Sequence, residues 1–263
     1  MGEKQTVRIS LLGTFSVSRG SLCVGEPMAG RESQSWKLLK YMCANYSRTV
    51  DVEELTRELI FAGSENNIDN TLRVRLRRAR AILDRVGLGD KRNGLLLYGN
   101  GKYWINGDLE PVIDAREADG LYRRAADSTL GAEERLSACL RAIGLFGGRY
   151  LQYSEKSAYA ELLREKYDAV FRALLRLVFE LMRISGDWSG VPRVCESVMR
   201  VFPDGLDVHD HVLCALIGAH MTAEAVTYYT NVAVALANTD LRLPDFGSYL
   251  ERRRARINMG GQA

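Results

Sequence analysis

The chain has 263 residues, of which 46% are hydrophobic and 26% are charged. These fractions are close to those of globular proteins, so they exclude a largely disordered or fibrous chain. The formal net charge is only +3. No apolar run approaches the roughly 18 residues of a membrane span, and the polar N-terminus lacks the apolar stretch of a signal peptide. We therefore expect a cytoplasmic protein with no membrane partner.

The basic side chains are concentrated in the N-terminal part of the chain. Residues 1–106 have a net charge of +6, whereas residues 107–263 have a net charge of −3. Eight lysines and arginines lie within residues 73–92, which hold only two acidic residues. Such a cluster is typical of a surface that binds a polyanion. We expect a domain boundary at residue 106.

The first third of the chain mixes strand and helix patterns. Apolar and polar residues alternate within the first 27 residues, which predicts short strands with a hairpin turn at 19–21. Residues 32–45 have a helical period. A second helix is expected to begin at Asp51, because Asp51 and Glu54 have the spacing of a capping box.

A third helix is predicted from about residue 66 to residue 86, and Gly87 ends it, because glycine tolerates the left-handed conformation. Strand-like runs follow at 95–98 and 103–105. The Gly-Asn-Gly-Lys segment at 99–102 between them has the composition of a hairpin turn.

The third helix has two different faces. Leu72, Leu76, Ala79 and Leu83 fall at positions i, i+4, i+7 and i+11, so they share one face for packing. The opposite face is polar and mainly basic, and Arg78 flanks it. Its members are Asn70, Arg73, Arg77, Arg80 and Ala81.

Beyond residue 107 the strand signals vanish and amphipathic helices follow one another. Their succession suggests an all-helical domain of stacked antiparallel pairs, similar to tetratricopeptide repeats. The overall fold class is therefore α+β and predominantly α, with small antiparallel sheets confined to residues 1–106. The helices are expected near residues 114–127, 132–146, 157–185, 188–201, 206–220, 222–238 and 246–257, the first of them starting with a capping box at Asp114 and Glu117.

Strands, three helices and a closing hairpin follow the order of a winged helix-turn-helix domain. Residues 72–83, LRVRLRRARAIL, resemble the recognition helix of OmpR/PhoB-type DNA-binding domains, with Val74, Leu76, Arg78, Arg80 and Leu83 at matching positions. Arginine at 75 replaces the usual histidine and alanine at 79 the usual leucine. The hairpin LLLYGNGKYWI resembles the family's wing, lengthened by a lysine at 102.

The remainder resembles the bacterial transcriptional activator domain that follows such a winged helix in small SARP-type regulators. The resemblance rests on Val-Ile-Asp at 112–114, Gly-Arg-Tyr-Leu at 148–151, and Ala-Glu-Ala at 223–225 before Tyr228 and Tyr229. It implies a bacterial activator that binds promoter direct repeats, with two protomers on each site and RNA polymerase as a partner.

Independently of any family, this helix suits the major groove of double-stranded DNA, where arginine can bond guanine O6 and N7. Arg73 and Arg77 are expected to read bases, and Asn70 to read adenine or bind phosphate. Arg78, Arg80 and Lys102 are expected to clamp phosphates. Arg75 is a further candidate contact, although it lies nearer the packing face.

Other constellations carry less chemistry. His209, Asp210, His211, Cys214 and His220 contain zinc-ligand types. His209 and His211, however, point to different faces of a helix, so we interpret this group as structural. All three histidines lie in one segment, so no catalytic triad has positional support. We expect no enzyme activity, no metal and no cofactor.

The sequence thus predicts a sequence-specific transcriptional regulator that acts through the helix near 66–86. Two alternatives remain open. In the first, the chain is a protein–protein adaptor that acts through its helical domain, while the basic domain binds nucleic acid unspecifically. In the second, the chain is a ligand-gated repressor whose helical domain binds an unknown small-molecule or peptide effector.

Overall fold

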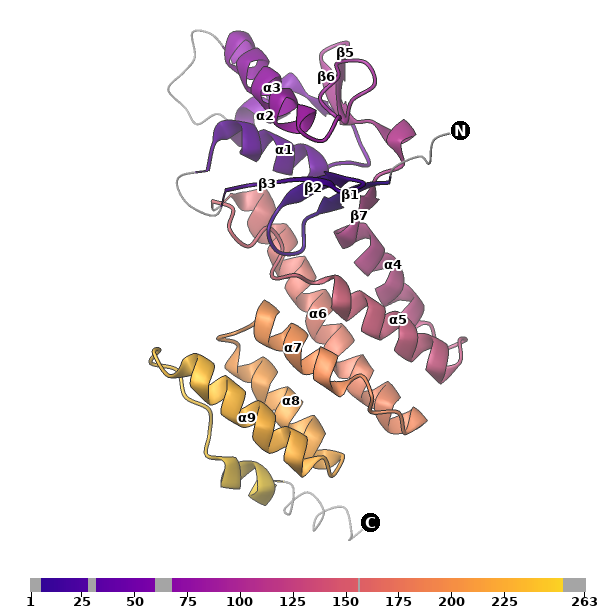
Figure 1. Cartoon of the computed structure of the whole chain (residues 1–263), viewed down its shortest axis with the longest axis vertical. Coiled ribbons are helices and arrows are strands. Elements are labelled where there is room, and N and C mark those ends of the chain that lie inside the picture. The colour runs from indigo at the N-terminus through magenta and orange to yellow at the C-terminus, as the bar shows by residue number, and fades with distance from the viewer. Residues whose placement is uncertain (1–5, 28–31, 60–67, 156, 253–263) are drawn as a thin grey trace. The chain divides into compact units, whose positions relative to one another are not determined.

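Figure 1 shows the computed structural model of the chain, which describes residues 6–27, 32–59, 68–155 and 157–252; the side chains of residues 68–70 are also outside this description. The chain forms two compact units. The first unit contains Met1–Glu117 and Tyr150–Tyr167, and the second contains Ala118–Arg149 and Asp168–Ala263. Each unit is described by itself below.

A four-stranded sheet of the first unit has the order β3-β2-β1-β7. Strands β1 (Val7–Ser10), β2 (Ser16–Arg19) and β3 (Leu22–Gly25) form an antiparallel meander. The β2–β3 turn contains Gly20 at φ 58°, as the sequence predicts. Strand β7 (Val112–Ile113) pairs in parallel with β1, and the paired residues are 104 positions apart in the sequence.

The second sheet of this unit has the order β4-β6-β5. Strands β5 (Leu96–Gly99) and β6 (Lys102–Ile105) form a hairpin, and β4 (Val50–Asp51) adds to the β6 edge. Asn100 and Gly101 connect the hairpin at φ 51° and 74°. Positive φ at both central residues is the conformation that matches the twist of a two-residue hairpin, which explains the Asn-Gly pair.

Three helices complete the first unit: α1 (Gln34–Ala44), α2 (Val52–Leu59) and α3 (Ile68–Asp84). Helix α1 packs against α2, α3 and β6, so it is buried along nearly its whole length. Even Lys40 is only 1% exposed, and its ammonium group pairs with the carboxylates of Glu26 and Glu32. Pairing compensates the cost of burying this charge.

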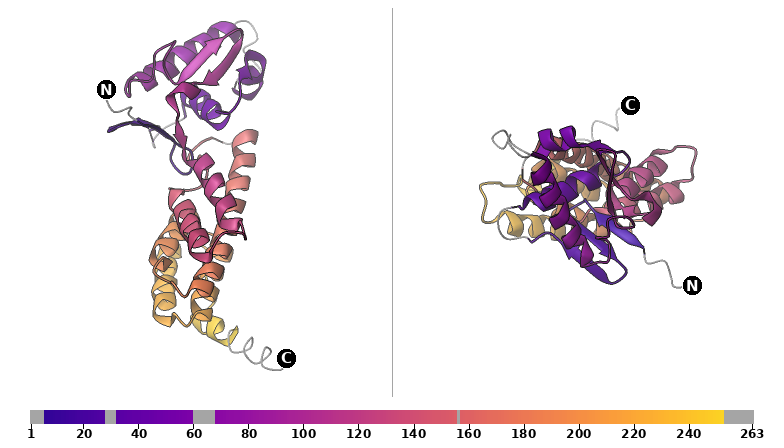
Figure 2. Two further views of the ribbon diagram at one scale, coloured as in Figure 1. Left: turned by 90° about the vertical axis from the view of Figure 1, so that its right-hand side faces the viewer. Right: turned by 90° about the horizontal axis from the view of Figure 1, so that it is seen from above.

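The regular secondary structure described in the second unit is entirely helical. It contains α5 (Ala132–Leu145), α7 (Val191–Val201), α8 (Leu206–Gly218), α9 (Thr222–Leu236) and a last helix at 246–252; α4 (Asp114–Ala126) and α6 (Ala158–Ser185) contribute residues to both units. Helix α5 packs against α7, α7 against α8, and α8 against α9. Figure 2 shows helices of this unit packed side by side in an antiparallel arrangement. The described residues contain no helix long and apolar enough to cross a membrane.

The helix ends differ from the expected capping boxes. Asp51 Oδ1 accepts a bond from the Glu54 backbone N–H at 2.7 Å, as predicted, but the Glu54 carboxylate does not return to Asp51. The Glu54 carboxylate instead accepts a hydrogen bond from the Tyr41 hydroxyl and forms an ion pair with Arg48. Asp114 accepts bonds from Leu11 and Leu12 as well as from its own helix.

The grouping of residues also differs from a division at residue 106. Strand β7 lies beyond that residue and extends the first sheet. The backbone N–H of Leu151 donates to the Leu11 carbonyl oxygen at 2.8 Å, and that of Gln152 to Gly13 at 3.1 Å. These segments satisfy hydrogen bonds of the first unit, so they belong to it despite their distance in sequence.

Candidate nucleic-acid interface

Helix α3 is held in the first unit by one apolar face. Leu72, Leu76, Ala79 and Leu83 are all buried, which confirms the packing face that their spacing predicts. This face packs against α1. Gly87 at φ 68° ends the helix, and the Leu88 N–H donates to the Leu83 carbonyl oxygen at 3.0 Å. The helix therefore has a fixed rotation about its axis, which decides which arginines reach solvent.

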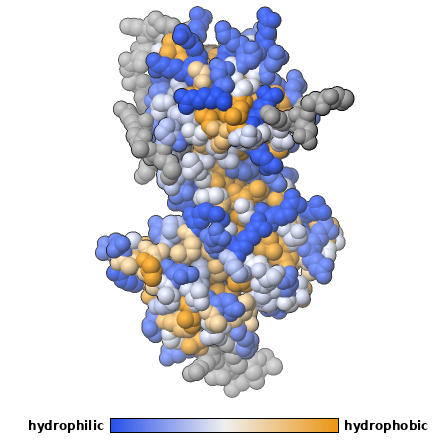
Figure 3. Space-filling model, in the orientation of Figure 1, coloured by the Kyte–Doolittle hydropathy of each residue, from blue (hydrophilic) through white to orange (hydrophobic). Residues whose placement is uncertain are grey.

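Three arginines of α3 point to solvent. Arg73, Arg77 and Arg78 are exposed. None of the three forms an ion pair or hydrogen bond with the residues that the structure describes. The N–H donors of these guanidinium groups are therefore available to a ligand. Figure 3 shows hydrophilic side chains gathered at the end of this unit that carries α3 and the β5–β6 hairpin.

A groove of about 430 Å³ runs beside two of these arginines, between α3 and the loop that follows it. Arg73, Arg77 and Arg80 line its helical side, and Gly89 and Lys91 line its loop side. A Cβ atom at Gly89 would overlap the side chain of Asp84 in α3. Glycine at this position therefore lets the loop approach the helix and carry Lys91 toward the basic face.

Lys91 is a candidate contact that the sequence analysis did not single out. It is exposed and lies in a tight turn, where Asp90 Oδ1 accepts from the backbone N–H groups of Arg92 and Asn93 at 2.8 and 2.6 Å. These bonds lower the pKa of Asp90 below its usual value. The high density of basic residues over 73–92 is the sequence signal that includes Lys91. Its place at the groove follows only from the structure of the turn.

Arg80 lies on the same side of α3 but is engaged within the unit. Its Nε and Nη2 donate to the carbonyl oxygen of Leu96 in β5, at 3.2 and 3.0 Å. The side chain is half-buried, and this burial lowers its pKa. The fork of Arg80 is thus directed at the hairpin backbone, and its expected contact with a phosphate stays a prediction.

Arg75 is also engaged. Its Nη1 donates to the carbonyl oxygen of Leu59, the last residue of α2, at 3.2 Å. Burial lowers its pKa as well. A cation at a helix C-terminus satisfies a free carbonyl group and complements the helix dipole. Arg75 therefore joins α3 to α2 rather than extending from the exposed face.

The remaining two expected contacts are Asn70 and Lys102. The backbone of Asn70 is in α3, but its side chain lies outside the described residues. Lys102 begins β6 directly after the hairpin turn and is exposed. Beside it, the rings of Tyr98 and Tyr103 contact each other with centroids 4.6 Å apart. This ring pair stiffens the hairpin near its tip.

The histidine cluster of the second unit is engaged in packing. His209 is fully buried, its Nδ1 is 2.7 Å from the Tyr228 hydroxyl, and its Nε2 is 3.2 Å from the Pro203 carbonyl oxygen. Burial lowers the pKa of His209, so the ring is neutral near pH 7. Among the residues that the structure describes, no three histidine, cysteine or acidic side chains are placed to hold a metal ion.

Comparison with solved structures finds a likeness in fold. The chain is similar to the structure of EmbR from Mycobacterium tuberculosis in complex with a low-affinity phosphopeptide, with a TM-score of 0.58 and 15% sequence identity. The two chains share a fold. The match covers 96% of this chain and 66% of the EmbR chain, so this chain spans slightly less than two thirds of EmbR. No protein-family model matches the sequence, and no curated protein matches it.

The likeness to EmbR extends over both units, because it covers nearly all of this chain. Within the first unit, α3 presents guanidinium groups that have no partner in the described part of the chain, and the adjoining hairpin presents the ammonium group of Lys102. Such donors can bond phosphate oxygens and the O6 and N7 acceptors of guanine. An α-helix also has the width that the major groove of DNA admits.

Proposed function

We propose that the chain is a DNA-binding transcriptional regulator whose first unit is a winged helix of the OmpR/PhoB type. The observation that carries this proposal is the set of exposed arginines Arg73, Arg77 and Arg78, which have no partner among the described residues and lie on the helix that Arg80 joins to the β5–β6 hairpin. The fold shared with EmbR, a SARP-type transcriptional regulator, supports it. Helix α3 acts as the recognition helix and the hairpin as the wing.

The individual roles follow from exposure and bonding. Arg73 and Arg77 are one turn apart on the exposed face and read base edges in the major groove. Arg78, Lys91 and Lys102 contact phosphates and fix the register. Arg75 and Arg80 position α2 and the wing, because their donors bond backbone carbonyl groups of those elements. The role of Asn70 stays as the sequence predicts it, at an adenine or a phosphate.

The second unit is proposed to act as a tetratricopeptide-like activator domain, with contacts to a second protomer or to RNA polymerase. The succession of packed antiparallel helices supports this part. Two protomers on direct repeats would gain affinity from their effective concentration. The proposal includes no catalytic step and no cofactor.

Selection from a random pool of duplex DNA tests the proposal. The full chain is incubated with the pool at about 0.15 M salt, and bound DNA is recovered, amplified and sequenced over several rounds. We expect enrichment of one motif, present as a direct repeat. An unenriched pool, bound with strong salt dependence, would favour the adaptor with unspecific nucleic-acid binding, because phosphate contacts alone carry no sequence preference.

A further inference from the structure

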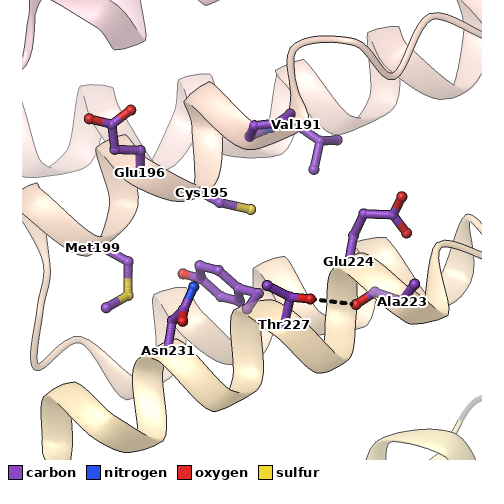
Figure 4. A pocket seen from close by; sticks show the side chains of 10 residues that line it. Val191, Cys195, Glu196, Met199, Ala223, Glu224, Thr227 and Asn231 are labelled. Carbon is purple, nitrogen blue, oxygen red and sulfur yellow. Dashed lines mark hydrogen bonds between the residues drawn. The ribbon is translucent and has the colours of Figure 1, made fainter.

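The second unit contains a groove between α7 and α9 that the proposed DNA-binding function does not use. Its volume is about 670 Å³. Small-molecule sites have volumes of about 300 to 1,000 Å³ and are mostly apolar. Figure 4 shows that the groove is open between the two helices, with side chains of both helices directed into it.

Both walls follow from helical spacing. The lining positions recur every fourth residue: Val191, Cys195 and Met199 on α7, and Ala223, Thr227 and Asn231 on α9. Residues four apart lie on one face of a helix, so each helix directs a continuous strip toward the other. Val234 continues the α9 strip and is 70% exposed. The strips do not close against each other, which leaves the apolar space.

Two polar groups that line the groove are bonded within the second unit. Tyr228 lines the groove, and its hydroxyl is 2.7 Å from His209 Nδ1, so this bond fixes the orientation of the tyrosine ring. Thr227 Oγ1 donates to the Ala223 carbonyl oxygen at 3.0 Å. Burial raises the pKa of Cys195 to about 12, so its thiol stays uncharged. The Cys195 sulfur points into the space in Figure 4.

The charge at the edge of the groove has one sign. Glu196 and Glu224 border it, and none of the lysines and arginines that the structure describes lines it. Glu196 has a distant partner, Arg200, at 3.9 Å. Glu224 lies in the first turn of α9 and has no ion-pair partner among the described residues. Glu224 is also exposed, so its carboxylate is accessible to a ligand.

We propose that this groove binds a small organic molecule with an apolar body and one protonated amine. The body contacts Cys195, Met199 and Tyr228, and the ammonium group pairs with Glu224. The apolar lining accounts for the body, and the two carboxylates account for the charge, because no basic side chain of the described part of the chain lines the groove with them. This inference goes beyond the proposed DNA-binding function and does not depend on it.

Three fluorescent probes of matched shape test the proposal on the full chain without DNA. Dansylcadaverine carries a primary amine, its N-acetyl derivative is neutral, and the dansyl derivative of aminohexanoic acid is anionic. Dansyl emission shifts to the blue in an apolar site. We expect saturable binding in the order amine, neutral probe, anion, because only the amine is attracted by the carboxylates.

Glu224→Gln removes the charge and retains the shape of the side chain. It should weaken binding of the amine by about two- to fivefold, the range expected for an exposed ion pair, and leave the neutral probe unchanged. Glu180→Gln is the matched control, because Glu180 is an exposed carboxylate on α6 that does not line the groove. It should bind all three probes as the parent chain does.

Two variants fill the groove from opposite walls, Ala223→Trp from α9 and Met199→Trp from α7. Each should abolish the blue shift of the probe. Circular dichroism and the melting temperature show whether the variant is folded, and one folded variant is enough for the test. The proposal is overturned if no probe binds saturably, if the three probes bind equally, or if a folded Trp variant binds like the parent. Dissociation of a dimer by either variant would instead assign the groove to a contact between two copies.

Discussion

The guanidinium group of Arg80 donates two hydrogen bonds to the carbonyl oxygen of Leu96, which joins α3 to the first strand of the β5–β6 hairpin. The two residues are sixteen positions apart. One bond uses Nε and the other Nη2, so the planar fork has a defined orientation. In the proposed interface this link sets the distance between the recognition helix and the wing.

Arg80→Ala separates this positioning role from a phosphate contact. The substitution should lower the free energy of unfolding by about 1 to 2 kcal/mol, because the part-buried carbonyl group of Leu96 loses its charged donor. Urea unfolding measures this change, and Arg78→Ala, an exposed arginine of the same helix, serves as the control with unchanged stability. Unchanged stability of Arg80→Ala together with a salt slope for DNA binding lower by about one unit would restore the phosphate role.

Lys102→Ala tests the wing. We expect weaker binding to all DNA sequences and a salt slope lower by about one unit, because one fewer phosphate counterion is released. Binding titrations at several salt concentrations give the slope. Arg183→Ala, an exposed arginine of α6, should leave the slope unchanged. Equal slopes for Lys102→Ala and the parent chain would show that the wing lysine does not touch the DNA backbone.

Asp114 gives the first unit a pH dependence. Burial raises its pKa from 3.8 to about 6, against the opposing effect of bonds from the Leu11, Leu12 and Ala115 N–H groups. Between about pH 4 and pH 6 the folded chain therefore holds a proton that the unfolded chain releases. Stability should fall as pH rises through this window, by at most about 1.4 kcal/mol per pH unit.

Comparison of the parent chain with Asp114→Asn isolates this effect. The amide does not titrate, so the stability of the parent relative to the variant should fall from pH 4 to pH 6 and then become constant. Urea unfolding at a series of pH values measures the difference. Parallel pH profiles of the two proteins would contradict the raised pKa.

The boundary of the first unit can be tested with two fragments. Fragment 1–106 lacks β7 and Asp114, whereas fragment 1–117 retains the β1–β7 pairing and the bonds to Leu11 and Leu12. Fragment 1–117 should melt at a higher temperature, because fragment 1–106 leaves these backbone groups without their partners. Equal melting temperatures would show that residue 106 is an adequate boundary after all.

Local patterns made much of the first unit predictable from sequence. The spacing of Leu72, Leu76, Ala79 and Leu83 gave the packing face of α3, and Gly87 gave its end. The Asn100-Gly101 pair gave the hairpin turn. These features depend on residues only a few positions apart, so a single sequence contains the information.

Contacts between distant segments could not be predicted in the same way. Arg80 is seven positions after Arg73, which is nearly two full helical turns, so both arginines belong to one face by periodicity alone. Only the approach of Leu96 distinguishes them. The parallel pairing of β7 with β1 likewise joins residues 104 positions apart, and no local pattern indicates it.

The most direct test of the account is a base-by-base comparison of Arg73→Ala and Arg77→Ala with the parent chain. After the preferred duplex has been selected, each base pair is changed in turn and the relative affinities are measured in competition. We expect each variant to lose discrimination at one base position, worth about 1 to 3 kcal/mol, while Arg183→Ala retains the full preference. Unchanged preference and affinity in both variants would contradict the assignment of α3 as the recognition helix.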